Sequence, residues 1–325
     1  MRVLVTGGAG YVGAVSVDAL LAAGHDVMVL DDLSTGHADA VPSEATLRHG
    51  SYGDLEASRR ILEDERIDAI LHCGARSLVG ESMTDPARYW RDNVAGGIAL
   101  LEAARLAGVA RFVFSSSAAV YGVPERTPIE EDDPIRPINT YGETKAAFER
   151  GLGAYGTSHG LRSVTLRYFN VAGATDRVGE RHDPETHLIP NALKAADGGP
   201  PLSLFGDDYP TPDGTAIRDY IHVSDLADAH LAALDATARD DARTDSPLIC
   251  NLGTGSGFSV REVLAAAESA IGRAVPHAIA PRRAGDPPVL VASNQRAAEA
   301  LGWLPRRSSL EEMIGSAWER RRRDR

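Results

Sequence analysis

The chain has 325 residues and a formal net charge of −12 at pH 7, and 43% of its residues are hydrophobic and 25% charged. This composition is typical of a globular protein, and the length suits one large or two modest domains. The negative charge argues against general binding of nucleic acid or anionic membranes. No apolar run approaches the roughly 18 residues of a membrane span. The chain enters a strand without a signal-peptide pattern, which predicts a cytoplasmic protein.

The amino terminus predicts a dinucleotide site. A short apolar strand is followed by Gly7, Gly10 and Gly13, and a helix is expected over residues 14–23. Glycines at this spacing allow a tight turn, close approach of the backbone to a pyrophosphate and packing of the helix on the strand. The helix amino terminus then faces the phosphates. Asp31 ends the next strand, where its carboxylate can accept from both adenosine ribose hydroxyls and repel the extra phosphate of NADP, so NAD is the expected cofactor.

Strands and helices alternate through residues 1–170, and they include an expected strand over residues 47–52 and a long expected helix over residues 85–108. This alternation predicts a parallel sheet covered on both faces. We predict an α/β fold: a Rossmann-type, doubly wound NAD-binding domain over residues 1–170, to which the chain returns around residues 215–252. Residues 171–325 form a smaller α/β domain for the substrate. Ligands of such sheets bind outside the carboxyl ends of the strands. Gly74 and Asn170 follow strands at that edge, and Asp54 and Leu55 are placed to reach the adenine.

One further stretch carries groups for alcohol–ketone chemistry. Tyr141 and Lys145 lie four apart on an expected helix and therefore share a face. A nearby ammonium favours the phenolate and lowers the tyrosine pKa from about 10. Ser117, at the end of the strand that begins at Phe112, can hydrogen-bond the same substrate hydroxyl. Tyrosine and lysine at this spacing also occur by chance on many helices. Here the glycine turn and the shared sheet edge favour the catalytic interpretation.

We predict no metal site. Two histidine pairs, His182 with His187 and His222 with His230, lack the surrounding pattern of a metal centre and are interpreted as structural or loop residues.

Beyond these features, the chain resembles the extended short-chain dehydrogenase/reductase family, and within it the 4-epimerases of UDP-sugars. The resemblance extends from Met1 to about Trp303. The motifs that carry it are residues 6–13, 115–122, 141–145, 166–170, 204–206, 218–223 and 282–286.

The resemblance implies a redox-neutral epimerisation at C4 of the hexose, from UDP-galactose to UDP-glucose, through a 4-keto sugar. It also implies a homodimer formed through the helices that begin near Asp85 and Tyr141. The implied NAD-binding residues are Gly7, Gly10, Tyr11, Val12, Gly13, Asp31, Asp32, Asp54, Leu55, Gly74, Asn93, Tyr141, Lys145 and Tyr168. The implied substrate-binding residues are Ser117, Tyr141, Asn170, His187, Leu188, Leu204, Phe205, Arg218, Arg283, Asp286 and Leu290.

Three positions depart from the family pattern. Ser77 stands where a lysine is common, His187 where an asparagine is usual, and Leu290 where residue size is associated with the choice of sugar. A UDP-N-acetylglucosamine or UDP-glucuronate 4-epimerase therefore stays open, as does a non-catalytic NAD-binding or UDP-sugar-binding protein on the same fold. A 4,6-dehydratase is disfavoured because Ala118 and Ala119 supply no acid pair.

Overall fold

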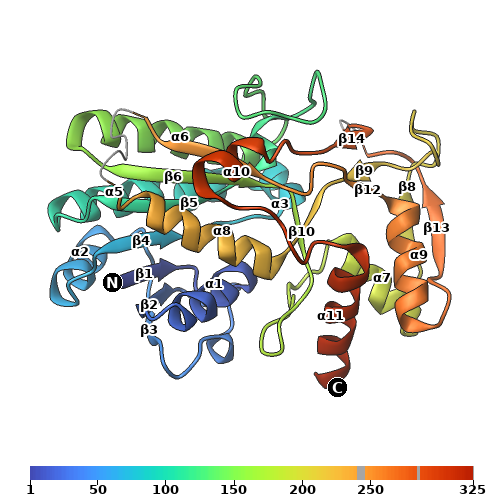
Figure 1. The fold of residues 1–325 in the computed structure, drawn as a ribbon, viewed down its shortest axis with the longest axis horizontal. Coiled ribbons are helices and arrows are strands. Elements are labelled where there is room, and N and C mark those ends of the chain that lie inside the picture. The colour runs from blue at the N-terminus through green and yellow to red at the C-terminus, as the bar shows by residue number, and fades with distance from the viewer. Residues whose placement is uncertain (240–245, 284–285, 325) are drawn as a thin grey trace.

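The computed structural model describes residues 1–239, 246–283 and 286–324 (Figure 1). Within these residues, seven parallel strands form a central sheet in the order β11-β6-β5-β4-β1-β2-β3. The strand order reverses between β1 and β4, which is the switch point where such sheets bind ligands. The predicted doubly wound sheet is confirmed. Its strands are β1 (Arg2–Thr6), β2 (Asp26–Asp31), β3 (Thr46–His49), β4 (Ala69–His72), β5 (Arg111–Ser117), β6 (Arg162–Tyr168) and β11 (Leu248–Leu252).

Helices cover both faces of the sheet (Figure 1). Alternation along β1 shows why: Val3 and Val5 pack in one hydrophobic core, and Leu4 packs in the other. The first core lies under α1 (Tyr11–Ala22), α8 (Val223–Ala236) and α10 (Gln295–Leu301). The second lies under α2 (Leu55–Asp64), α5 (Gly96–Leu106) and α6 (Thr140–His159).

The remaining elements form a second lobe beside the carboxyl ends of the strands, with its own hydrophobic core (Figure 1). The chain returns to the sheet at α8 and β11, as expected, and again at α10 and Trp303. The division of the chain at residue 170 stays a prediction. The lobe contains β7 (Asn170–Ala172), α7 (Leu188–Ala196), β8 (Leu202–Phe205), β9 (Ile217–Arg218), β10 (Tyr220–His222), β12 (Phe258–Ser259), α9 (Val260–Ile271), β13 (His277–Ala280), β14 (Val289–Leu290) and α11 (Leu310–Arg323).

The helix expected over residues 85–108 is interrupted. It consists of α4 (Pro86–Tyr89), a π-helical segment η2 (Trp90–Ala95) and α5, and a short helix α3 (Val79–Thr84) precedes it. A π turn inserts an extra residue without changing the apolar pattern much, so the sequence gives no signal for it. Short 3₁₀ helices lie at Ala38–Ala40 and Ala118–Val120. Over the described residues, none of the helices is both long and apolar enough to cross a bilayer.

Candidate active site

A cavity of about 1720 Å³ lies at the carboxyl ends of the sheet strands, with residues of both lobes in its lining. This volume exceeds the roughly 300–1,000 Å³ of a pocket for one drug-sized molecule and suits two large ligands. The structure brings most of the predicted site residues to this one cavity. They are Gly7, Gly10, Tyr11, Val12, Gly13, Asp31, Asp32, Gly74, Ser117, Tyr141, Lys145, Tyr168, Asn170, His187, Leu188, Leu204, Phe205, Arg218, Arg283, Asp286 and Leu290.

The glycine turn fits the backbone so closely that side chains are excluded. Gly7 has a φ of +72°, and a Cβ placed there would lie 2.5 Å from the nitrogen of Gly74. A Cβ on Gly13 would lie 2.1 Å from the carbonyl oxygen of Gly7. Gly10 is the N-cap of α1 and offers no side-chain cap. The first N–H groups of α1, beside the cavity, therefore lack intrahelical acceptors and are available to donate hydrogen bonds to a phosphate group.

Asp31 and Asp32 lie at the end of β2, beside this turn. The Asp31 carboxylate accepts from the backbone N–H groups of Ala9 (2.9 Å) and Leu33 (2.8 Å), which fixes its orientation at the cavity. Burial raises the pKa of Asp31, and these two hydrogen bonds oppose the rise. Asp32 accepts from the backbone and hydroxyl of Ser34. Both oxygens of Asp31 keep a free lone pair for a ribose hydroxyl.

The structure places Asp54 and Leu55 outside the cavity lining. Because β3 ends at His49, earlier than the expected strand at residues 47–52, the chain crosses the sheet edge at residues 51–53. Asp54 then caps α2 by accepting from the N–H of Ala57. Their contact with adenine stays a prediction, and the neighbouring Tyr52, which the sequence did not single out, lines the cavity instead.

Asn93, also predicted at the cofactor, lies behind the lining rather than in it. Its side chain is buried in η2 and makes two hydrogen bonds to the backbone of Arg76, at 2.8 and 3.0 Å. It also donates to the Thr144 hydroxyl of α6 (3.1 Å). Asn93 thereby joins the loop after β4 to the helix that carries Tyr141 and Lys145, so its effect on the cavity is indirect.

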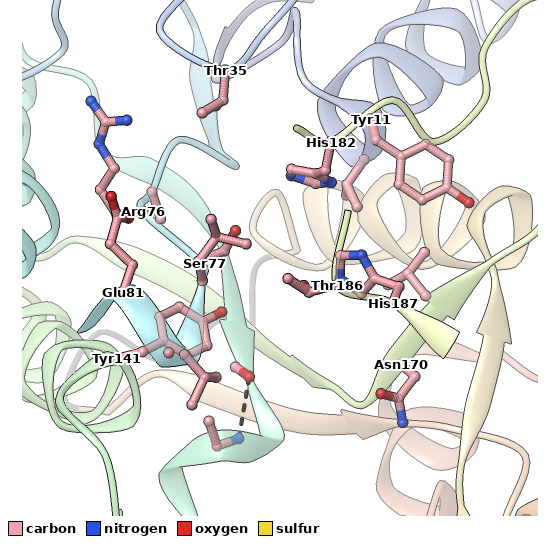
Figure 2. A pocket seen from close by; sticks show the side chains of 18 of the residues that line it. Tyr11, Thr35, Arg76, Ser77, Glu81, Tyr141, Asn170, His182, Thr186 and His187 are labelled. Atoms are coloured by element: carbon pink, nitrogen blue, oxygen red, sulfur yellow. Dashed lines mark hydrogen bonds between the residues drawn. The ribbon is translucent and has the colours of Figure 1, made fainter. Parts of the chain in front are cut away.

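Tyr141 and Lys145 lie one turn apart on α6, whose start is fixed by Asn139 capping the N–H of Gly142. Tyr141 points into the cavity (Figure 2). The Lys145 ammonium lies 5.8 Å from the centre of the Tyr141 ring and donates to the backbone carbonyl of Ser115 (2.7 Å). Ser117 ends β5 on the same lining and accepts from the N–H of Ala119. The three residue types predicted for proton transfer therefore share one wall.

The pKa of Tyr141 is not lowered in the way that an adjacent ammonium was expected to lower it. Burial raises the pKa of Tyr141, and a hydrogen bond with Ser117 lowers it by less. Burial lowers the pKa of Lys145 to about 8. Because the ammonium is directed at the Ser115 carbonyl, it does not offset the cost of burying a phenolate. Further positive charge beside the phenol is needed to make it basic.

A buried ion pair that the sequence did not reveal holds together the elements that carry Tyr141, Lys145 and Ser117. Arg167 of β6 and Glu149 of α6 have side chains that are 3% and 7% exposed, with a shortest N–O distance of 2.6 Å. Glu149 also accepts from the hydroxyl of Ser116 (2.5 Å), and Arg167 donates to that of Tyr121 (2.7 Å). The network ties α6 to β5 and β6. Single charges inside a helix and a strand give no sequence signal for such a pairing.

The opposite wall carries the predicted substrate residues. Arg218 pairs with Asp286, with an N–O distance of 2.5 Å, and the Arg283 guanidinium lies 4.0 Å from the centre of the Phe205 ring. Asn170 donates to the backbone carbonyl of Asp219 (2.9 Å) and lines the cavity beside them. Guanidinium groups held in this way suit phosphate oxygens. Ala284 and Gly285, the centre of the motif at residues 282–286, lie outside the described residues.

The other predicted substrate residues shape the remaining surface. His187 is the N-cap of α7, and its Nδ1 is 2.7 Å from Glu185 Oε1. Leu188 begins α7, Leu204 is buried in β8, and Leu290 of β14 packs against an apolar cluster that includes Val120. Leu290, the position where residue size is associated with the choice of sugar, is therefore half-buried on the cavity lining.

The histidine pairs differ. His222 caps α8 by accepting from the N–H of Ser224, and His230 is buried between the hydroxyls of Ser16 and Ser115. These two have structural roles, as interpreted. His182 and His187 both line the cavity.

Comparison with known proteins gives the family. The model of the NAD dependent epimerase/dehydratase family matches residues 3–253. A UDP-glucose 4-epimerase of Streptomyces lividans is 49% identical over 98% of this chain and 95% of its own. The structure of a Brucella ovis UDP-glucose 4-epimerase in complex with NAD is 46% identical, with a TM-score of 0.94 over 98% of this chain and 97% of that one. The Bifidobacterium longum enzyme in complex with NAD+ and UDP is 34% identical, with a TM-score of 0.92 over 100% and 99%. This chain belongs to the NAD dependent epimerase/dehydratase family.

Proposed function

We propose that this chain is an NAD-dependent UDP-glucose 4-epimerase that interconverts UDP-galactose and UDP-glucose. The observation that carries the proposal is a single cavity that holds Ser117, Tyr141 and Lys145 together with the glycine turn at one end and Arg218 at the other. Relatives with 46–49% identity over nearly the whole chain bear that name. The neighbouring structures contain NAD, and one of them also contains UDP.

The residues present fit NAD. The glycine turn leaves no room for side chains, the first turn of α1 offers free N–H groups, and Asp31 is held at the end of β2. When bound, NAD supplies the acceptor for a hydride, later returns it, and places a positive ring charge in the site. That charge would favour the Tyr141 phenolate, for which the Lys145 ammonium alone does not suffice.

In the proposed mechanism, Tyr141 takes the proton from the 4-hydroxyl of the sugar, and Ser117 hydrogen-bonds the same oxygen. The hexose becomes a 4-keto sugar, rotates about its bond to the pyrophosphate and presents its other face. Tyr141 then returns the proton, and the configuration at C4 is inverted. Arg218 and Arg283 hold the pyrophosphate throughout, which keeps the nucleotide fixed while the sugar turns.

We also infer that the chain forms a homodimer. Apolar side chains are exposed on α3 and η2, which lie beside α6: Met83 (59% exposed), Trp90 (43%) and Val79 (46%), which also lines the rim of the cavity. Grouped large apolar residues of this kind mark interaction surfaces. The helices concerned are those for which the family resemblance implies a dimer contact.

The proposal is tested by following UDP-galactose, UDP-N-acetylgalactosamine and UDP-glucuronate in parallel by ¹H NMR with the purified chain. UDP-galactose is expected to be converted. Tyr141→Phe should lower conversion by at least about 10³-fold because the proton acceptor is gone, while binding of UDP stays within about threefold. Turnover of UDP-glucuronate alone would overturn the choice of substrate. Full activity of Tyr141→Phe would overturn the mechanism.

A further inference from the structure

The loop between β7 and α7 places metal-ligating side chains on the cavity wall. One ligand atom each from Glu180, His182 and His187 lie within 4.8 Å of one another. The two imidazole rings are tilted with their centres 5.4 Å apart. Figure 2 shows both on the side of the cavity that also carries Tyr11, across from Tyr141. The family resemblance implies a substrate contact for His187, and the proposed epimerase reaction assigns no role to Glu180 or His182.

The two carboxylates of the loop have histidines as their charge partners. The side chains of Glu180 and Glu185 are only 11% and 15% exposed. Over residues 1–239, 246–283 and 286–324, each of these carboxylates pairs with a histidine and not with a lysine or an arginine. Arg181, which lies between them in sequence, pairs with Asp39. With neutral imidazoles the group carries two negative charges, and partly buried carboxylates are costly without a cationic partner.

We propose that Glu180, His182 and His187 form a binding site for Zn²⁺ or a chemically similar divalent transition metal. Two imidazoles and one carboxylate are a typical zinc ligand set, whereas Mg²⁺ and Ca²⁺ prefer oxygen ligands alone. A tetrahedral zinc ion with bonds of about 2.0–2.2 Å places its ligand atoms roughly 3.3–3.6 Å apart, so ligand atoms that now lie within 4.8 Å of one another must move closer by up to roughly 1.4 Å. Two charges on the ion balance the two carboxylates.

Glu185 completes the site as an outer partner. Its Oε1 is 2.7 Å from His187 Nδ1, which leaves Nε2 of this histidine to coordinate the ion. A carboxylate that orients the metal-binding imidazole is usual in zinc sites. Three protein ligands leave a fourth position open for water, facing the cavity that the three residues line. The proposal thus replaces, for His182 and His187, the interpretation as loop residues.

The site is tested by metal titration of the full-length chain, stripped with a chelator and desalted. Calorimetry with ZnCl₂ at pH 8 is expected to give one ion per chain, and Co²⁺ should give the visible absorption of a tetrahedral site. Alkaline conditions are chosen because the hydrogen bond with Glu180 raises the pKa of His182, and protons compete with the metal. His182→Gln and His187→Gln should each weaken Zn²⁺ binding at least tenfold.

The matched control is His277→Gln, which removes the histidine of β13, elsewhere in the second lobe. It should leave the affinity for Zn²⁺ unchanged. Circular dichroism checks that each variant is folded, and His182→Gln alone suffices if His187→Gln is not. Absence of a stoichiometric zinc site, or equal affinity in the His182→Gln variant and the wild type, would overturn the proposal. The titration needs no nucleotide sugar, so its outcome is independent of the proposed epimerase activity.

Discussion

At the scale of single residues, burial decides the chemistry of the site more than sequence spacing does. The spacing of Tyr141 and Lys145 correctly placed both groups on one cavity wall. It suggested that the ammonium would lower the pKa of Tyr141, whereas burial of the phenol raises that pKa. The Lys145 ammonium instead donates a hydrogen bond to the backbone carbonyl of Ser115. Desolvation depends on everything packed around a group, which a pair of sequence positions does not contain.

Two buried histidines also make the stability of the fold sensitive to acid. Burial lowers the pKa values of His72 and His230 to about 3 each, with the Lys145 charge adding to the effect at His72. Below about pH 6.5 these histidines bind protons in the unfolded chain but stay neutral in the folded chain. Their contribution to the free energy of unfolding is therefore fully present above that pH and is lost as the pH falls towards 3. Each histidine contributes a slope of about 1.4 kcal/mol per pH unit in this window.

The measurement is the free energy of unfolding in urea at pH 7.5, 6.0 and 5.0. His230→Asn is expected to be less stable at pH 7.5, because hydrogen bonds with Ser16 and Ser115 are lost. Its loss of stability between pH 6.0 and 5.0 should be smaller than that of the wild type by about 1.4 kcal/mol. The same pH slope in both proteins would contradict a neutral buried His230.

At the scale of elements, periodicity predicted most of the sheet strands, the helix that carries Tyr141 and Lys145, and the return of the chain to the sheet at β11. It missed the π turn at η2, which turns Asn93 towards the backbone of Arg76. It also misplaced the end of β3, so Tyr52 rather than Asp54 reaches the cavity. Element ends and inserted residues depend on local hydrogen bonds that leave the apolar pattern unchanged.

The buried pair between α6 and β6 makes an element-scale prediction. Arg167→Met leaves the Glu149 carboxylate buried without its partner and should lower the free energy of unfolding by about 3–5 kcal/mol. Adding Glu149→Leu removes the stranded charge, so the double variant should be more stable than Arg167→Met alone by at least about 1 kcal/mol. Arg177→Met, which breaks the half-exposed pair with Asp18, is the control and should cost about 1 kcal/mol or less. A double variant that is less stable than Arg167→Met would refute this account.

At the scale of the whole molecule, two lobes enclose one cavity because the chain crosses between them several times. The sequence indicated the crossing at α8 and β11 but not that at α10, since a short helix followed by Trp303 does not reveal which core it joins. The motifs after Asn170 are scattered in sequence, and pairings between distant strands, such as β7 with β10, β8 with β13 and β9 with β14, bring them to one cavity. Such long-range pairings are set by the packed fold and not by local pattern.

The proposed homodimer is a whole-molecule prediction. Light scattering after gel filtration should give twice the chain mass of 34.5 kDa. Met83→Asp places a charge in the exposed apolar group and should shift the mass towards that of the monomer. Ile279→Asp, at an equally exposed position (59%) on β13, is the matched control and should leave the dimer intact. A wild-type monomer, or equal effects of the two variants, would argue against this interface.

The proposed chemistry is tested most directly with UDP-galactose carrying deuterium at C4, incubated in ordinary water with the purified chain and one equivalent of NAD. If the hydride leaves C4 and returns to the same carbon, ¹H and ²H NMR will show UDP-glucose that keeps its deuterium at C4, and Tyr141→Phe will form none. Exchange of the deuterium with solvent during conversion, or the absence of any UDP-glucose, would contradict the account.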